Sequence, residues 1–144
     1  MKIETVEDCF KYRLLRKINP DIEKSKVSIK IAEEKLKRAK EAFKNGFFDF
    51  VIIEAYTSMF HAARALLYKD GIQEKSHYAI YIYLKEKYKD KIPLQIINLL
   101  NIYRLERHET LYGFEFKPNK EDASSAIEDA KIFLKEIKKI LSKV

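Results

Sequence analysis

Apolar residues recur at helical spacing along most of the chain, in blocks that end at glycine or proline. The first long block covers residues 19–46, and its apolar positions repeat at close to a heptad. Asn19 and Pro20 open this block, and Gly46 closes it. An asparagine cap, a proline at the first helical position and a glycine stop are typical of helix ends. The pattern predicts one long helix with a single buried stripe.

The next block, Phe47 to Asp70, is apolar on several sides and is followed by Gly71. A helix that is apolar over most of its surface is typical of the centre of a bundle. Two further blocks, residues 76–88 and 93–112, predict a shorter helix and then a longer one. The longer one is expected to end at Gly113.

A last helix is predicted from Asn119 to the C-terminus, with Asp122 placed to complete a capping box. Residues 5–18 predict a short N-terminal helical extension. Short connections between amphipathic helices favour antiparallel neighbours. The sequence therefore predicts an all-α fold, an up-and-down bundle of four to five helices. The whole chain, residues 1–144, is expected to form one domain with its core at about 19–141.

Composition agrees with a helical globular protein, because 144 residues include 47% hydrophobic and 35% charged side chains but only 3 Gly and 3 Pro. The lone Cys9 cannot form an internal disulfide, which favours a reducing compartment. The N-terminus lacks the apolar core of an export signal, and no run of about 20 apolar residues is present. We therefore expect a cytoplasmic protein. Its many Lys, Glu and Ile residues resemble the composition of heat-adapted proteins.

The chain is basic, with a net charge of +7 and a pI near 9.3. Such a charge permits an anionic partner, but lysines spread over solvated helix faces produce it equally well. The sequence contains no glycine-rich phosphate loop, no HExxH, no Cys/His metal spacing and no GxSxG motif. We therefore expect no metal and no cofactor.

Two polar strips recur at helical spacing and carry the candidate chemistry. The first lies at Thr57, His61, Arg64 and Tyr68. The second lies at Arg104, Arg107, His108 and Tyr112. If the strips meet, they form a cationic pocket in which arginine binds phosphate and histidine moves a proton. That set is sufficient for RNA cleavage without a metal, because the 2′-hydroxyl is an internal nucleophile.

A purely structural role remains open for each of these residues. His61 can be a core histidine with its hydrogen bonds satisfied. His77, which follows Ser76 at a predicted helix start, can serve local capping. The basic residues before Gly113 can complement the dipole of a helix C-terminus. Tyr112 can pack under the loop that follows.

Several runs resemble a HEPN domain of the small stand-alone prokaryotic branch. They are "MFHAARALL" and "EKSH" within residues 55–88, then "YRLERHETLYGFEF" and "EDASSAIEDAKIFLKEI", in order and at fitting distances. The resemblance covers roughly residues 19–141. It implies a helical bundle that pairs as a homodimer. It also implies a metal-independent ribonuclease acting as a toxin, often beside a small nucleotidyltransferase antitoxin that in some cases adenylylates a tyrosine.

The catalytic motif of that family is an arginine, four to six residues and then a histidine, and this chain departs from it. The matching interval runs from Arg107 to Tyr112. A phenol with a pKa near 10 is a poor general base at neutral pH, which weakens the prediction of nuclease activity. His108 stands one turn before Tyr112. The resemblance therefore assigns candidate catalytic roles to Arg107 and Tyr112. The position of His108 on the same helix face adds it as a third candidate, specific to this chain.

The residues assigned to phosphate or nucleotide binding are His61, Arg64, His77 and Arg104. Three functions compete. The first is a ribonuclease toxin or a degenerate relative, and the second is a module that binds a nucleotide or docks a nucleotidyltransferase. The third is a non-catalytic dimeric scaffold. We rank nucleotide or RNA binding with ribonuclease-like chemistry first, because the resemblance implies both functions and the catalytic motif is imperfect.

Overall fold

The computed structural model describes residues 2–113 and 115–143, which are mostly helical. Helices and two short strands follow one another in these residues. The elements are α1 (Val6–Lys11), β1 (Leu15–Lys17), α2 (Ile22–Lys44), α3 (Phe48–Asp70), β2 (Ile72–Glu74), α4 (His77–Lys87), α5 (Leu94–Tyr112) and α6 (Lys120–Leu141).

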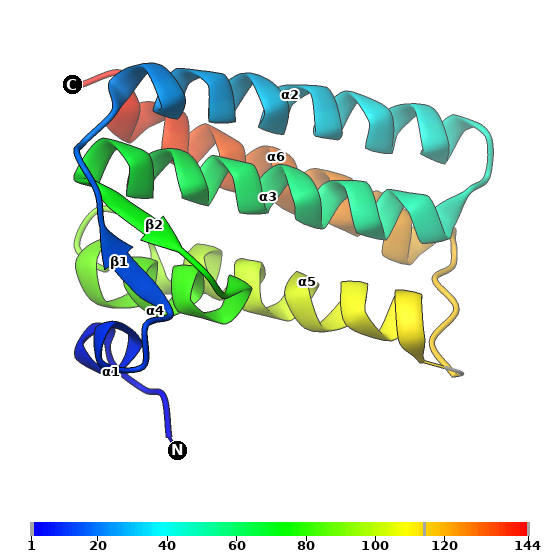
Figure 1. Cartoon of the computed structure of the whole chain (residues 1–144). Coiled ribbons are helices and arrows are strands. Elements are labelled where there is room, and N and C mark those ends of the chain that lie inside the picture. The colour runs from blue at the N-terminus through cyan, green and yellow to red at the C-terminus, as the bar shows by residue number, and fades with distance from the viewer. Residues whose placement is uncertain (1, 114, 144) are drawn as a thin grey trace.

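Four long helices, α2, α3, α5 and α6, form the body of the molecule (Figure 1). Helix α3 packs against each of the other three, and its buried side chains, including Ile52, Met59 and Leu66, lie at the centre of the core. This arrangement explains why the sequence of α3 is apolar on several sides. The predicted all-α bundle is confirmed.

The ends of the helices follow from local capping. Gly71 ends α3 with a φ of 77°, a left-handed conformation that glycine adopts without strain. Asn119 and Asp122 form the predicted capping box at the start of α6. Ser76 caps α4 by accepting a hydrogen bond from the backbone N–H of Ala79.

The predicted start of α2 is wrong. Asp21, and not Asn19, is its N-cap, because the Asp21 carboxylate accepts a hydrogen bond from the backbone N–H of Lys24 at 2.9 Å. The residues before it are held by the end of α3, since the N–H of Ile18 donates to the carbonyl of Gly71. That long-range tie keeps the segment before Asp21 out of the helix.

The N-terminal extension also differs from the predicted helix over residues 5–18. Helix α1 ends at Lys11, and Arg13 adopts a positive φ of 60°. The chain then forms β1, which pairs antiparallel with β2 so that Leu15 lies opposite Glu74. The pairing buries Leu15, which is 2% exposed. Periodicity within residues 5–18 cannot reveal it, because the partner strand lies more than fifty residues away in the sequence.

Among the described residues, no helix has both the length and the hydrophobicity needed to cross a lipid bilayer. Cys9 is fully buried and unpaired in the packing between α1 and the rest of the core.

Candidate functional site

Helices α3, α4 and α5 meet at a histidine that is held by two aromatic side chains. Ser76 caps α4, so His77 is the first helical residue. The ring of His77 stacks on Phe60 of α3, with 4.2 Å between centroids and 19° between planes. Its Nδ1 lies 2.7 Å from the hydroxyl of Tyr56, one turn earlier on α3. His77 is nevertheless exposed, so its inner side is anchored while its outer side faces solvent.

Two arginines of α5 lie against the same group of rings. The guanidinium of Arg107 is 5.8 Å from the centroid of Tyr56, and that of Arg104 is 5.1 Å from the centroid of Tyr78. Arg104 also donates a hydrogen bond from Nε to Asn101 at 2.9 Å. Within the part of the chain that the structure describes, neither arginine forms a salt bridge. We refer to Tyr56, His77, Arg104 and Arg107 as the arginine–histidine cluster.

The electrostatics of this cluster keep its histidine neutral. Partial burial of the ring lowers the pKa of His77, and the charges of Arg107, Arg104 and Arg64 lower it further. Burial raises the pKa of Tyr56, although Arg104 and Arg107 oppose that shift. At neutral pH the cluster therefore contains two arginine cations, an uncharged imidazole and a protonated phenol.

Arg64 lies beside the cluster but already has an acidic partner. Its Nε is 2.7 Å from a carboxylate oxygen of Glu74, a residue of β2 whose side chain is 6% exposed. The Arg64 guanidinium also lies over the rings of Phe60 and Tyr68, at 5.8 and 5.2 Å from their centroids. Its positive charge acts on His77, while the ion pair with Glu74 offsets part of that charge.

His61 points toward α2. It lines a groove of about 330 Å³ between α2 and α3, together with Arg64 and Tyr68. Burial, followed by the charges of Arg64 and Lys35, lowers the pKa of His61 to about 4. Its Nδ1 is buried and has no hydrogen-bond partner among the described residues, so His61 is not the satisfied core histidine that the sequence left open.

His108 and Tyr112 lie on the outer face of α5. Their rings are 4.9 Å apart, and Tyr112 is 67% exposed. The two predicted polar strips therefore meet only in part, because Arg104 and Arg107 face α3 and α4 while His108 and Tyr112 face solvent. The contact between α5 and α3 is made by Arg107 and Tyr56. Thr57 of the first strip does not take part, because its hydroxyl donates a hydrogen bond to the carbonyl of Ile53 in the same helix.

Tyr56 and Phe60 are apolar positions of the block that predicts α3, and the sequence did not identify either of them as a site residue. Their four-residue spacing is that of ordinary core packing, and Tyr56 is indeed 1% exposed. One property of Tyr56 could have indicated a role in the site, because a buried tyrosine hydroxyl needs a hydrogen-bond partner. Nothing in the local sequence identifies that partner as His77.

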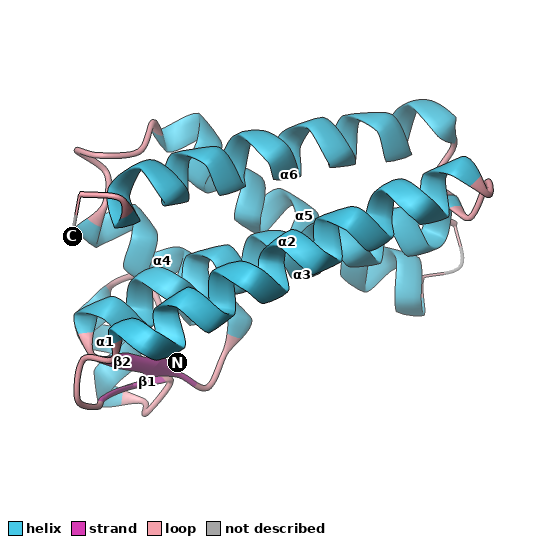
Figure 2. Cartoon of the chain, turned by 90° about the horizontal axis from the view of Figure 1, so that it is seen from above, coloured by secondary structure: helices cyan, strands magenta, loops and turns pink. Residues whose placement is uncertain are grey.

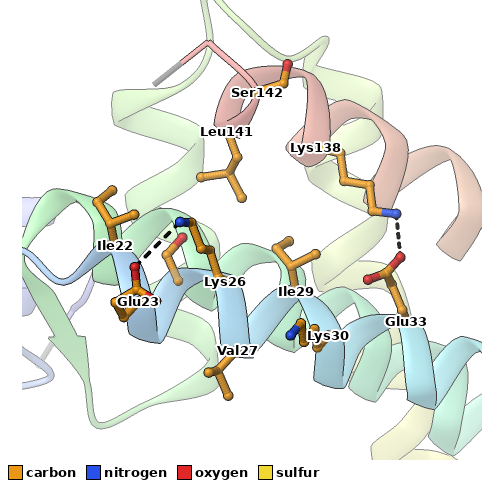
Figure 3. Close-up of a pocket in the computed structure, with 11 residues that line it drawn as sticks. Ile22, Glu23, Lys26, Val27, Ile29, Lys30, Glu33, Lys138, Leu141 and Ser142 are labelled. Carbon is orange, nitrogen blue, oxygen red and sulfur yellow. Dashed lines mark hydrogen bonds and ion pairs between the residues drawn. The ribbon is translucent and has the colours of Figure 1, made fainter.

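A separate cavity of about 530 Å³ lies between the start of α2 and the end of α6 (Figure 3). Figure 2 shows α2 and α6 diverging toward the end of the molecule where the C-terminus of the chain lies. Ile22, Ile29 and Leu141 contribute apolar side chains to its walls. The ion pair between Lys138 and Glu33, at 2.7 Å, closes one side. None of the predicted site residues lines this cavity, so we place the candidate chemistry at the arginine–histidine cluster.

Within residues 2–113 and 115–143, no group of three or more His, Cys, Asp or Glu side chains has the arrangement of a metal site. Two guanidinium groups and an imidazole can bind an anion, and the surrounding rings offer faces on which a base can stack.

Comparison with known proteins gives a consistent family assignment. The family model described as HEPN domain matches residues 25–140. "Putative toxin MJ0605" from Methanocaldococcus jannaschii is 34% identical over 134 residues, covering 88% of this chain and 96% of that protein. A "UPF0332 protein" from Archaeoglobus fulgidus is 31% identical over 80% of this chain and 93% of its own length. "Putative toxin MJ0142" from M. jannaschii is 28% identical over 78% of each chain.

Proposed function

The chain belongs to the HEPN domain family, and from that premise we propose that it is a toxin-like cytoplasmic protein that binds single-stranded RNA through its phosphates. One observation carries the proposal. Arg104 and Arg107 are half-buried, have no acidic partner in the described part of the chain, and lie beside His77. Partly desolvated charges without a partner are costly, and an anionic ligand relieves that cost.

The aromatic rings around these charges favour RNA over a simple anion. The rings of Tyr56, Phe60 and His77 contact one another across α3 and α4, and Tyr78 of α4 lies beside Arg104. Arginine binds phosphate through paired hydrogen bonds, and exposed rings stack on bases whatever their sequence. His77 is the exposed ring of this group, and the charges of both arginines act on it.

Binding is tested with a fluorescent single-stranded RNA oligonucleotide in EDTA. We expect Arg107→Ala to lower the affinity about tenfold or more, the cost of losing a charged hydrogen bond to phosphate. The slope of log K against log salt should fall by about 1. Lys131→Ala is the matched control, because it removes one positive charge from the exposed face of α6, where Lys131 pairs with Glu128. Equal affinities for wild type and Arg107→Ala would reject the site.

A second candidate function is metal-independent RNA cleavage by Arg107, with His108 or Tyr112 as the proton-transfer residue. It is favoured by the contact between the rings of His108 and Tyr112, one and five residues after Arg107 on the accessible side of α5. RNA incubated with the protein in EDTA should be cut by wild type but not by Arg107→Ala or His108→Ala. If wild type leaves the RNA intact, this candidate falls and the binding proposal stands.

We further infer that a minimal nucleotidyltransferase is the cognate partner, because the chain resembles HEPN toxins and two relatives carry the word toxin in their names. If the gene beside that of this chain encodes a small nucleotidyltransferase, co-expression of the two proteins should yield a stable complex. Growth arrest on expression of the chain alone, relieved by the partner, would support a toxin–antitoxin pair. If the protein neither binds RNA nor arrests growth, the alternative of a dimeric scaffold that docks a partner is favoured.

A further inference from the structure

We propose that His77 binds the phosphate as a neutral hydrogen-bond donor, through an Nε2–H that its contact with Tyr56 holds outward. This inference rests on the proposed function, because it assigns a role within the same RNA-binding cluster. It makes His77 a ligand-binding residue and not a proton-transfer residue. The argument begins with the hydrogen bond between the two side chains.

The direction of that hydrogen bond follows from the surroundings of Tyr56. Its hydroxyl is 2.7 Å from Nδ1 of His77 and forms no other hydrogen bond among the described residues. If Nδ1–H donated to the phenol, the hydroxyl hydrogen of a side chain that is 1% exposed would be left without an acceptor. Leaving a buried donor unsatisfied is costly, so the phenol donates and Nδ1 accepts. The single proton of the neutral imidazole then resides on Nε2.

The charges around the ring oppose its protonation. Helix α3 contributes Tyr56, His61 and Arg64, and helix α5 contributes Arg104 and Arg107. The three arginines disfavour an imidazolium, and Tyr56 and His61 are uncharged at neutral pH. The pKa of His77 is lowered accordingly. Its position as the first residue of α4 acts in the same direction, because the positive end of a helix dipole favours the neutral ring.

The same geometry directs Nε2–H toward the ligand. Nδ1 faces Tyr56 on the protein side, the ring lies flat on Phe60, and the residue is exposed. The opposite ring nitrogen therefore points away from the packed side, and no described residue accepts a hydrogen bond from it. With Arg104 and Arg107 acting on the same ring, the cluster offers three donors and no acceptor to an incoming phosphate.

Substitutions at His77 separate a neutral donor from a charged one. Binding of the same RNA probe is measured for wild type, His77→Gln and His77→Ala between pH 6.5 and pH 8. We expect His77→Gln, whose side-chain amide can also donate at Nε2, to stay within about threefold of wild type. His77→Ala should weaken binding about tenfold. Wild-type affinity should change by less than about twofold across this pH range.

Tyr56→Phe tests the positioning role of the phenol. It should weaken binding several-fold, and nitrogen NMR of the free protein should show His77 changing from a defined Nε2–H tautomer to a mixture. A merely structural role for Tyr56 would leave the tautomer signals unchanged. Circular dichroism establishes that each variant is folded before binding is compared.

The results distinguish this inference from the proposed function. If His77→Gln loses as much affinity as His77→Ala, or if wild-type binding falls steadily as the pH rises, the donor is a charged imidazolium and the inference is wrong. In that case Arg107→Ala would still weaken RNA binding about tenfold or more, as the proposed function requires. If RNA does not bind at all, the proposed function fails and the phosphate-binding role of His77 fails with it, whatever the NMR tautomer of His77 in the free protein. If RNA binds but that tautomer is not Nε2–H, only the inference is wrong.

Discussion

At the scale of single residues, the protein places two histidines in different surroundings only a short distance apart. His77 is exposed and its Nδ1 is hydrogen-bonded, whereas the half-buried His61 has a buried Nδ1 without a partner in the described residues. Both are surrounded by cations, with Arg64 acting on each. A neutral histidine in a cationic setting makes folding depend on pH, because the unfolded chain binds the proton more readily.

His61 should therefore make the protein less stable in acid. Its pKa is about 4 in the folded state and 6.5 when unperturbed, so the unfolded state binds more protons as the pH falls below about 6.5. We expect His61 to reduce the free energy of unfolding by up to about 2 kcal/mol between pH 7.5 and pH 5. The measurement is urea denaturation of wild type and His61→Gln at both pH values.

The comparison between the two proteins isolates His61, because His77 and every carboxylate titrate in both. Wild type should lose more stability in acid than His61→Gln. Parallel losses would show that His61 is not held neutral. An NMR titration of His61 with a midpoint near 6.5 would contradict the same prediction directly.

At the scale of secondary-structure elements, the end of α3 determines how the N-terminal segment docks. Gly71 turns the chain into β2, and its carbonyl accepts a hydrogen bond from Ile18 just after β1. The N–H of Asp21 donates to the carbonyl of Tyr68 nearby. A single turn thus holds the strand pair and the start of α2 against α3.

Two glycines with nearly the same backbone conformation allow this docking to be tested. Gly46 has a φ of 76° and Gly71 a φ of 77°. A Cβ at Gly46 would meet nothing within 4 Å, whereas one at Gly71 would lie 2.7 Å from the carbonyl oxygen of Ile18 and 3.0 Å from Cγ of Pro20. We expect Gly46→Ala to cost about 1 kcal/mol, the left-handed penalty alone.

Gly71→Ala should cost about 3 kcal/mol, because the backbone overlap is added to that penalty. Thermal and urea denaturation of both variants provide the measurement. Similar losses for the two would mean that the segment at Ile18 moves aside freely and that the strand pair contributes little to stability.

These element ends also show what the sequence can reveal. Helices α3 to α6 were predictable because periodicity and caps such as Asn119 are local properties of the chain. The strand pair was not predictable, because a strand of three residues such as β1 is too short to show a periodic pattern. Its partner β2 also lies far away in the sequence, after Gly71. The same contrast applies to the site. Arg107 was identified from local spacing and family resemblance, whereas the contact between Tyr56 and His77 depends on how α3 and α4 pack.

At the scale of the whole molecule, α5 presents an exposed apolar stripe beside the arginine–histidine cluster. Ile102, Leu105 and Tyr112 are 48%, 51% and 67% exposed, and their spacing places them on one face of the helix. The exposed Glu109 interrupts this face one turn after Leu105, but three exposed apolar side chains on one helix face favour association. We therefore propose that two copies pair through this outer stripe of α5, around a two-fold axis that brings the same stripe of each copy together.

Such a dimer would place His108 and Tyr112 of both copies near one another, since these residues lie on the same face. Leu105→Glu should then convert the protein to a monomer, because two charges would be buried at the axis without partners. Ile132→Glu is the matched control, since Ile132 is 44% exposed on α6 and lies outside the stripe. Sedimentation velocity at micromolar concentration measures both. A monomeric wild type, or dimers in both variants, would remove the outer stripe of α5 as the interface. If Leu105→Glu is monomeric yet binds RNA normally, each cluster binds phosphate within its own chain.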